Sequence, residues 1–523
     1  MSKISPILLQ VFKNRFASIA EEMGVTLNRT AFSPNIKERR DFSCAIFDRS
    51  GDMIAQAAHI PVHLGSMPLS VKAAITAVPF VKGDMVMLND PFCGGTHLPD
   101  ITVVAPVFID SAAPAYYVAN RAHHADVGGL TPGSMPLAKT IHDEGVVIPP
   151  VKFVHAGEVD RSFLDELLLK VRTPHEREGD FNAQIMANLT GIRRCRELLE
   201  KYGDVQVDRY SSALVDYAER MMRSTIRAIP DGTYHYADHL DDDGFGTEGI
   251  VIDLKLEIRG DRAILDFSGS SAQVEGGVNA VYAITLSAAL YVFRCLVEED
   301  IPTNAGCQRP IQVLTRQGSV VDAAYPASVA AGNVETSQRV VDVILGALAR
   351  AVPGKIPAAS QGTMNNITIG GTDPVSGRPF AYYETLAGGS GASRHHAGAS
   401  AVHSHMTNTL NTPVEALEYS YPFLVTAYAV RADSGGAGEH SGGDGMVREL
   451  ELLADAEVTV LSERRTRAPY GLCGGAAGAP GRNTVVVDGR DITKPGKFTV
   501  KLAAGSRVRI ETPGGGGFGK PEK

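Results

Sequence analysis

The stretch NDPFCGGTHLPDITVVAPVFIDSAAPAYYVANRAHHADVGG, residues 89–129, decides how the fold of this chain is interpreted. It contains two His-x-x-Asp pairs: His97 with Asp100, and His123 with Asp126. The runs ITVVAPVFI and AYYVAN between the pairs are rich in β-branched and aromatic residues, which predicts two strands of a hairpin or two neighbouring strands. Three residues typical of turns separate the runs: Asp110, Ser111 and Pro114. Both pairs would then lie at strand ends, where their side chains can converge.

A metal site is one interpretation of these pairs. Imidazole nitrogen and carboxylate oxygen are ligands that zinc, manganese and iron accept, and no CxxC motif nearby indicates a structural zinc site. Glycine doublets at 94–95 and 128–129 flank the histidines and allow close backbone approach to a ligand. The other interpretation is packing, in which the aspartates cap turns and His123 and His124 are satisfied polar residues of a buried loop. A single pair is weak evidence, but the repetition makes the two interpretations comparable.

The composition indicates a multidomain globular protein of the α+β class. A chain of 523 residues with 44% hydrophobic and 21% charged residues is typical of two to four domains. The 54 glycines favour strands, tight turns and long loops over a helical bundle. We expect mixed and antiparallel sheets with packed helices and a β-rich C-terminal part. The expected domains are an N-terminal α/β domain with the candidate metal site (1–228), a central α+β domain (229–440) and a C-terminal β-rich domain (441–523).

Charge and cysteine usage limit which partners and which cellular compartment we expect. A net charge of -9 argues against non-specific binding to nucleic acid, which requires a basic face. The six cysteines show no metal-type or disulfide-type spacing, which favours a reducing compartment. The N-terminus lacks an apolar signal-type segment, and the most apolar run, 280–293, is too short to span a bilayer. We therefore expect a cytoplasmic protein with no membrane partner.

The N-terminal half predicts several elements around the central stretch. Apolar residues at helical spacing predict a long helix over 7–30, and strands are expected over 42–47 and from Met53. Asp41 precedes the first strand beside Arg39 and Arg40, and its spacing alone favours a surface ion pair over a ligand role. Pro61 lies between His59 and His63, so we expect these histidines in a loop that lines the cleft rather than on a helix.

Two further segments follow the central stretch. Residues 132–150 predict a long loop whose ionisable side chains are functional candidates: His142, Asp143 and Glu144. Residues 161–225 are helical in pattern, with Gly203 as a C-cap, and we expect these helices to serve packing.

The second half changes character near Pro230. Alternating residues predict antiparallel strands, and the run 241–244 (DDDG) is interpreted as a solvated turn because it lacks the downstream glutamate of a calcium loop. A buried helix is expected over 281–298. A second helix over 331–351, capped by Asn333 or Thr336, is expected to present its N-terminus to an anion. From about residue 443 the pattern is again of strands.

A histidine-rich tract precedes that tail. It holds His395, His396, His403 and His405. Metal binding, substrate contact and loop packing all remain open for this tract.

The chain resembles the hydantoinase B family, which includes the beta subunit of ATP-dependent N-methylhydantoinases, the C-terminal half of 5-oxoprolinases and the alpha-type subunit of acetone and acetophenone carboxylases. The resemblance covers the chain nearly end to end. It is carried by RRDFSCAIFD (39–48), HIPVHLGSMP (59–68), NDPFCGGTHLPD (89–100), NRAHHADVGG (120–129), TPGSMP (131–136), IPTNAGCQRP (301–310), NTPVEALE (411–418), RADSGGAG (431–438) and the PGGGGFG tail. One departure is GEHSGGDG, where Ser441 stands at a position that is arginine in many members.

The resemblance implies a site and a partner. It implies a divalent metal, zinc, manganese or iron, held by Asp41, His97, Asp100 and His123, with His124 and Asp126 as catalytic candidates for the general base. It also implies a hetero-oligomer with a hydantoinase A-type ATPase subunit, and ATP would bind to that partner rather than to this chain.

The same resemblance implies ATP-dependent hydrolysis. The partner would phosphorylate the oxygen of a cyclic amide, such as a hydantoin or 5-oxoproline, and this chain would perform the hydrolytic step that opens the ring. The alternative is the metal-containing subunit of an ATP-dependent ketone carboxylase. A third possibility is a scaffold without catalytic function, which would hold no metal.

Overall fold

Four sheets and eleven α-helices make up the part of the chain that the structure describes, in agreement with the predicted α+β class. The computed structural model describes residues 4–57, 59–109 and 113–521. The first sheet has seven antiparallel strands. In spatial order they are β2 (Met53–Gln56), β1 (Phe42–Asp48), β5 (Tyr116–His123), β4 (Asp100–Val107), β3 (Met85–Leu88), β6 (Val151–His155) and β7 (Glu158–Val159).

The predicted hairpin forms the centre of this sheet. Strands β4 and β5 pair antiparallel along their whole length, and every residue of both is buried. Two polar residues show why: Asn120 donates to Asn188 on helix α6, whereas Arg121 donates to Ser66 on helix α3. Neighbouring residues of β5 thus contact helices on opposite faces of the sheet, as the alternation of a strand requires. The predicted turn residues Asp110 and Ser111 lie outside the described residues.

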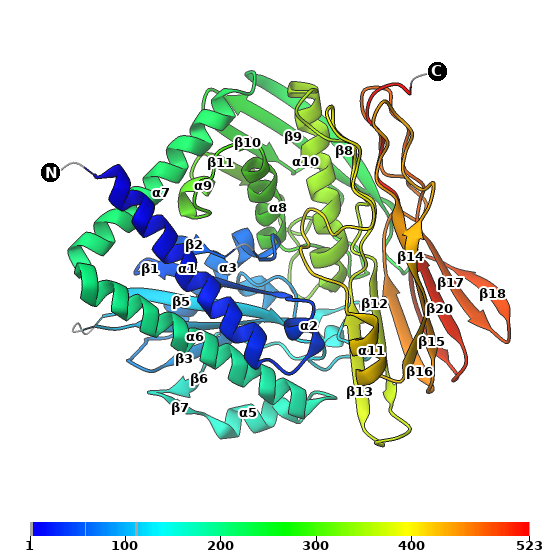
Figure 1. The fold of residues 1–523 in the computed structure, drawn as a ribbon, viewed down its shortest axis with the longest axis horizontal. Helices are drawn as coiled ribbons and strands as arrows, with labels where there is room; N and C mark the ends of the chain where they lie inside the picture. Colours follow the sequence, from blue (N-terminus) through cyan, green and yellow to red (C-terminus); the bar gives the residue numbers. More distant parts are fainter. Residues whose placement is uncertain (1–3, 58, 110–112, 522–523) are drawn as a thin grey trace.

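Helices cover both faces of this sheet (Figure 1). The predicted N-terminal helix is confirmed as α1, which begins at Pro6 behind the capping hydroxyl of Ser5. The α-helices are α1 (Pro6–Thr30), α2 (Pro34–Lys37), α3 (His63–Ala77), α4 (Ile141–Glu144), α5 (Arg161–Leu168), α6 (Pro174–Tyr202), α7 (Asp204–Arg227), α8 (Tyr282–Cys295), α9 (Ala305–Gln308), α10 (Ser337–Ala351) and α11 (Val414–Ser420). Two short helices of other types are η1 (Pro91–Cys93) and the π-helix η2 (Gly332–Thr336).

Three smaller sheets follow, and they confirm the predicted strands after Pro230 and the β-rich tail. The second sheet consists of β11 (Ile311–Leu314), β10 (Arg262–Asp266), β9 (Glu248–Arg259) and β8 (Gly232–Asp242). The third consists of β13 (Pro379–Glu384), β12 (Asn366–Thr372), β16 (Ala456–Leu461) and β19 (Lys497–Leu502). The fourth consists of β14 (Phe423–Arg431), β15 (Gly445–Leu452), β20 (Arg507–Glu511), β17 (Arg482–Val487) and β18 (Arg490–Lys494). The expected border at residue 440 lies between β14 and β15, which pair with each other.

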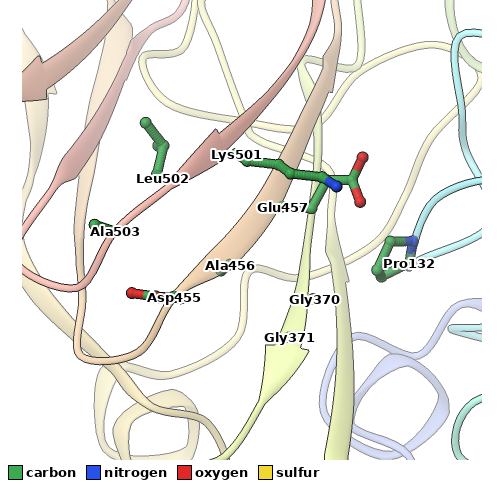
Figure 2. Close-up of a pocket in the computed structure, with 9 residues that line it drawn as sticks. All are labelled: Pro132, Gly370, Gly371, Asp455, Ala456, Glu457, Lys501, Leu502 and Ala503. Atoms are coloured by element: carbon green, nitrogen blue, oxygen red, sulfur yellow. The ribbon is translucent and has the colours of Figure 1, made fainter.

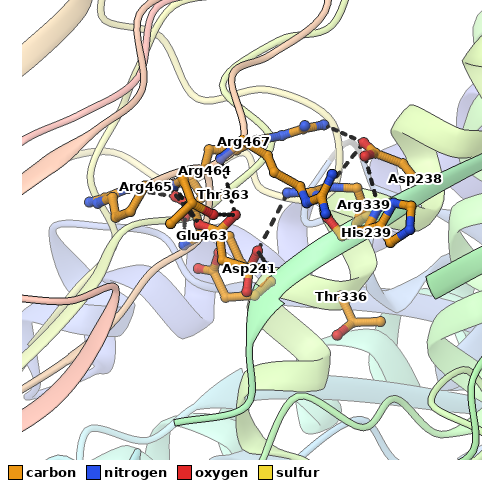
Figure 3. Close-up of polar contacts among 12 residues, drawn as sticks. Asp238, His239, Asp241, Thr336, Arg339, Thr363, Glu463, Arg464, Arg465 and Arg467 are labelled. Atoms are coloured by element: carbon orange, nitrogen blue, oxygen red, sulfur yellow. Dashed lines mark hydrogen bonds and ion pairs between the residues drawn. The ribbon is translucent and has the colours of Figure 1, made fainter. Parts of the chain in front are cut away.

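A buried ionic network joins the second sheet to helix α10 and to the C-terminal segments (Figure 3). Arg464 donates to Asp238 at 2.9 Å and to Asp342 at 2.6 Å. Asp241 accepts from the backbone N–H of Arg465 at 2.6 Å. The prediction of a solvated turn over 241–244 is wrong, because Asp241 and Asp243 are both buried, and Asp243 accepts from the backbone N–H groups of Phe245 and Thr247. A buried charge that loses its partner is costly, so the network holds three distant segments together.

Glycine-rich segments pack directly against each other beside the C-terminal sheets. We call this region the glycine bundle; it comprises residues 388–391, 398, 435–443, 471–478 and 513–518. Backbone hydrogen bonds link its segments: Gly515 N–H donates to the Gly443 carbonyl, and Gly436 N–H donates to the Gly515 carbonyl. A Cβ atom on Gly515 would overlap the carbonyl oxygen of Ser390. Glycine is required here because the chains approach each other too closely for any side chain.

No helix among the described residues is both long and apolar enough to cross a bilayer.

Candidate metal centre

Three neighbouring strands bring the predicted ligands to one edge of the first sheet. Asp100 begins β4 and His123 ends β5, and the two residues are directly opposite each other in the hairpin register. Asp41 immediately precedes β1, and its carbonyl accepts a hydrogen bond from the N–H of His123 at 3.0 Å. His97 enters from the loop before β4. The sheet register therefore places Asp41, His123 and Asp100 abreast.

Three of these side chains converge closely. His97 Nε2 lies 3.3 Å from His123 Nδ1. Asp100 Oδ1 lies 3.4 Å from His97 Nε2 and 3.3 Å from His123 Nδ1. Among the described residues this is the group of His, Cys, Asp and Glu side chains whose donor atoms could share a metal ion. Two ligand atoms that each lie about 2.0–2.1 Å from one ion at tetrahedral angles are roughly 3.3–3.4 Å apart. The spacing thus fits one small divalent ion.

The burial of the cluster also suits an ion. All three side chains are at most 2% exposed. The ring nitrogens that lack a hydrogen-bond partner within the described residues, His97 Nδ1 and His123 Nε2, are not the two that converge. Two imidazole nitrogens and one carboxylate oxygen face a common point, and a cation at that point would serve all three. The ring of His123 is fixed by stacking on Tyr383, with ring centroids 4.4 Å apart.

The second carboxylate oxygen of Asp100 is held by two groups that were not among the predicted metal ligands or catalytic residues, although His63 was expected to line the cleft and does so. Thr96 Oγ1 donates to Asp100 Oδ2 at 2.5 Å, and His63 Nε2 lies 3.2 Å from the same oxygen. His63 Nδ1 in turn lies 2.8 Å from Ser43 Oγ. Burial alone would raise the pKa of Asp100, but His97 and His63 outweigh it and hold that pKa well below its usual range. Asp100 therefore keeps one oxygen fixed and directs the other at the two histidines.

The expectation of a loop at His59 and His63 is wrong for His63. Helix α3 begins at His63, two residues after Pro61, and it contains Pro68. Proline is tolerated before a helix and in its first turn, so Pro61 does not prevent one from starting here. His59 lies outside the cluster and packs edge-on against Phe42.

Asp41 lines a cavity of about 20 Å³ together with His63, Asp100 and His123. The expected pairing with an arginine is present, because Asp41 Oδ2 lies 3.8 Å from Arg39 Nη2. The pair is buried rather than at the surface: Arg39 is 0% exposed and donates to the carbonyl of Tyr383. Burial raises the pKa of Asp41, and His123 and Arg39 act in the opposite direction.

The structure does not bring His124 and Asp126 to this cavity. His124 follows His123 directly, so it faces the opposite side of the sheet, where its Nε2 lies 3.0 Å from Gln184 Oε1 on helix α6. Asp126 Oδ1 pairs with Arg172 Nη1 at 3.0 Å and also accepts from Ser134. Both side chains hold neighbouring segments in place, and neither lines the cavity. Helix α6 thus contacts a predicted site residue in addition to packing.

The second half of the chain closes the cavity. Asn333 Nδ2 lies 3.1 Å from His97 Nε2. The N-terminus of the helix predicted over 331–351 is not free for a ligand anion, because the N–H groups of Val329 and Ala330 already donate to the carboxylate of Glu144 and the π-helix η2 that precedes α10 is buried. Its N-terminal N–H, that of Gly332, donates to the carbonyl of Gly277 at 2.9 Å.

The remaining candidates have mixed outcomes. The predicted long loop over 132–150 contains the short helix α4, and its Glu144 is buried and accepts from the N–H groups of Val329 and Ala330. In the histidine tract, His395 and His396 are exposed, whereas His403 and His405 are partly buried. Met406 and Thr407, which follow the tract directly, line the cavity.

A larger groove lies elsewhere. It has a volume of about 470 Å³ and runs along β12, β16 and β19 near Pro132 (Figure 2). Its polar side chains include the cross-strand pair Glu457 and Lys501. None of the metal-ligand or catalytic candidates predicted from the sequence lines it.

Comparisons with known proteins identify the family of the chain. Residues 5–521 match the hydantoinase B/oxoprolinase family, and the chain belongs to that family. It is 42% identical to 5-oxoprolinase 1 of Arabidopsis thaliana over 98% of this chain, and it spans 42% of that protein's length.

Two solved structures share the fold. The ATP-dependent caprolactamase of Pseudomonas jessenii is 30% identical and superimposes with a TM-score of 0.92 over 99% of this chain and 92% of that chain. An acetone carboxylase is 19% identical and superimposes with a TM-score of 0.91 over 99% of this chain and 76% of that chain, which shows a common fold.

Proposed function

We propose that this chain performs the hydrolytic step of an ATP-dependent cyclic amidase that opens a hydantoin, 5-oxoproline or a similar lactam. The observation that carries the proposal is the buried convergence of His97, Asp100 and His123 on a common point. Similarity to a 5-oxoprolinase and to an ATP-dependent caprolactamase supports the substrate class.

We assign His97, Asp100 and His123 as ligands of a divalent ion, with Asp41 as the fourth candidate from the same cavity. Such an ion, zinc, manganese or iron, supplies Lewis acidity and makes an amide carbonyl or water more reactive when it is bound. The protein side chains orient this site. Thr96 and His63 fix the carboxylate of Asp100, and Tyr383 fixes the ring of His123.

The chain's own residues also set the polarity of the site. The cavity holds roughly one water molecule, so bulk water is excluded from the cluster. His124 and Asp126 have other partners, which leaves Asp41, a residue of the cavity lining, as the candidate for either a ligand or a proton acceptor. Burial raises the pKa of Asp41 and so disfavours the charged form that both roles need, while His123 and Arg39 partly offset this effect.

Activation of the amide oxygen by phosphorylation is assigned to a hydantoinase A-type ATPase partner in a hetero-oligomer. An unstrained amide resists hydrolysis, and phosphorylation of its oxygen makes the amide carbon a far better electrophile. Water can then add to that carbon, the C–N bond breaks as a proton passes to the nitrogen, and a second water releases phosphate from the resulting acyl phosphate. The partner is proposed as a separate subunit or as part of a longer chain, because the Arabidopsis 5-oxoprolinase is more than twice as long as the region matched here.

The test begins with elemental analysis of the purified protein, wild type beside His97→Ala, Asp100→Asn and Asp41→Ala. His155→Ala is the matched control, because His155 is half-exposed and lies outside the cluster. We expect near-stoichiometric metal in the wild type and the control, and loss of metal in the cluster variants. Wild-type protein that is free of metal after purification without chelators would overturn the metal assignment and favour a scaffold function.

The second step adds an ATPase partner, ATP and candidate substrates. Ring opening of a lactam or hydantoin that requires ATP and His97 supports the proposal. ATP-dependent incorporation of labelled bicarbonate into a ketone, without ring opening, would instead establish the carboxylase alternative. Acetone carboxylase shares the fold, so the assay includes this alternative.

A further inference from the structure

A second cavity lies directly outside the metal centre. This outer pocket has a volume of about 480 Å³ and lies between the C-terminal half of helix α1 and the segments that contain Arg40, His59 and Asn408. The inner cavity at the metal centre is lined by the neighbouring residues of these same segments.

The two cavities share a wall. Arg40 and Phe42 line the outer pocket while Asp41, between them, lines the inner cavity. The same alternation occurs in two other segments. His59 is outer and Ile60 inner; Asn408 and Leu410 are outer, and Thr407 and Thr409 inner. Three separate segments therefore present one side to each cavity, so the wall between them is a single layer of chain.

Two hydrogen bonds hold this wall together. Asn408 Nδ2 donates to the carbonyl of His59 at 3.3 Å, and Leu410 N–H donates to the carbonyl of Arg39 at 3.1 Å. On the inner side, the hydroxyls of Thr385 and Thr409 lie 2.9 Å apart. The segment 407–410 is thus fixed as a partition between the solvent-facing pocket and the buried cluster.

The outer pocket carries two arginines that face solvent. Arg29 and Arg40 are exposed, and their guanidinium groups make no hydrogen bond or ion pair within the described part of the chain. The acidic residue of the lining is Glu21. Burial, together with His63 and Arg40, lowers the pKa of His59 to about 4, so His59 is neutral at physiological pH. The formal charge of the lining is therefore positive.

The backbone at Arg40 is built to direct this side chain outward. Arg40 has a φ of 55°, a left-handed conformation that is unfavourable for a residue other than glycine. Its neighbours Arg39 and Asp41 are both buried, and the positive φ lets the chain place these two inward with Arg40 at the surface. Strain at a residue that lines a cavity beside a candidate active site indicates a functional constraint.

We propose that the outer pocket binds the phosphoryl group of the activated substrate, with Arg29 and Arg40 as its anion-binding residues. This inference rests on the proposed function, in which a phosphorylated cyclic amide must reach the metal centre. Guanidinium groups recognise phosphate through paired, charge-assisted hydrogen bonds. Phe42, Val25 and Leu410 offer apolar surface in the same pocket for the carbon skeleton of the ring. The pocket would receive the activated substrate one layer of chain away from Asp41 and His123, and the substrate would reach the metal centre once the segment 407–410 moves aside.

The inference is tested by titrating methylphosphonate, a stable phosphoryl dianion, into the protein at low salt and measuring the heat of binding. The variants are Arg29→Gln, Arg40→Gln and Arg40→Lys. Arg15→Gln is the matched control, because Arg15 is an exposed arginine of the same helix as Arg29 but lines a different hollow.

We expect saturable binding to the wild type and roughly tenfold weaker binding in each glutamine variant, because each loses a charge-assisted hydrogen bond to the anion. Arg40→Lys keeps a charged donor and should bind more tightly than Arg40→Gln. The Arg15→Gln control is expected to match the wild type. Absence of saturable binding to the wild type, or an equal loss in Arg15→Gln, would overturn the inference.

This outcome is separable from that of the proposed function. Methylphosphonate binding through Arg29 and Arg40 without any ATP-dependent ring opening would support the anion site and refute the proposed amidase function. Ring opening that depends on His97 but is unaffected, in both KM and kcat, by Arg29→Gln and Arg40→Gln would refute the anion site alone.

Discussion

Replacement of His63 by alanine is expected to weaken metal binding without unfolding the protein. His63 does not reach the common point of the cluster; it holds Asp100 Oδ2 at 3.2 Å while Thr96 holds the same oxygen at 2.5 Å. A hydrogen bond to a charged group contributes about 1.5–3 kcal/mol. Because about 1.4 kcal/mol corresponds to a factor of ten, the loss is expected to weaken metal affinity about 10- to 100-fold. Thr96 still restrains the carboxylate in this variant, which places the expected effect nearer the lower value.

The assay is a competition titration with a chromophoric chelator, with circular dichroism and thermal unfolding as measures of folding. Thr96→Val is expected to have an effect of similar size, since it removes the other restraint. His155→Ala serves as a histidine replacement outside the cluster. A natively folded His63→Ala protein whose dissociation constant for the metal stays within about threefold of the wild type would refute the reasoning.

Three further outcomes are expected. Gly515→Ala should destabilise the fold by several kcal/mol because its Cβ overlaps a carbonyl of the glycine bundle, whereas Gly505→Ala, at a φ of 84° in open space, should cost about 1 kcal/mol; urea unfolding compares the two. Burial raises the pKa of Glu335 to about 8, above its value in the unfolded chain, so this residue lowers the free energy of unfolding as the pH rises from about 4.5 to about 8. Glu335→Gln should make the free energy of unfolding less dependent on pH in this range. Unfolding midpoints that fall equally in both proteins would contradict this expectation. His124→Gln should retain the full metal content by elemental analysis, since its ring faces helix α6; loss of metal would place it in the cluster after all.

The local sequence pattern was sufficient to predict the hairpin that carries the site. The alternating, β-branched runs of residues 100–107 and 116–123 predicted the hairpin, and the hairpin alone brings Asp100 opposite His123. The same alternation implies that the adjacent His123 and His124 face opposite sides of the sheet. Applied strictly, this rule would have removed His124 from the catalytic candidates.

Long-range packing decided what the sequence could not show. Asn333 reaches His97 across 236 positions, and Thr407 and Thr409 close the cavity from a segment that has no periodic pattern. No local signal connects such residues. His63 was within reach of sequence reasoning, but Pro61 suggested a loop, and only the tertiary structure shows that helix α3 starts there and directs His63 at Asp100.

The glycine bundle has a consequence for motion. Glycine-rich stretches usually exchange their amide hydrogens quickly, because nothing restricts the backbone. Here the amides of Gly436, Gly443 and Gly515 are each engaged by a carbonyl of another segment, and side chains are absent from the space between. Along the chain, the partition 407–410 lies between two parts of this bundle, residue 398 and residues 435–443. Both parts should be among the slowest-exchanging regions of the molecule, so any opening of the partition would have to hinge between residues 399 and 434.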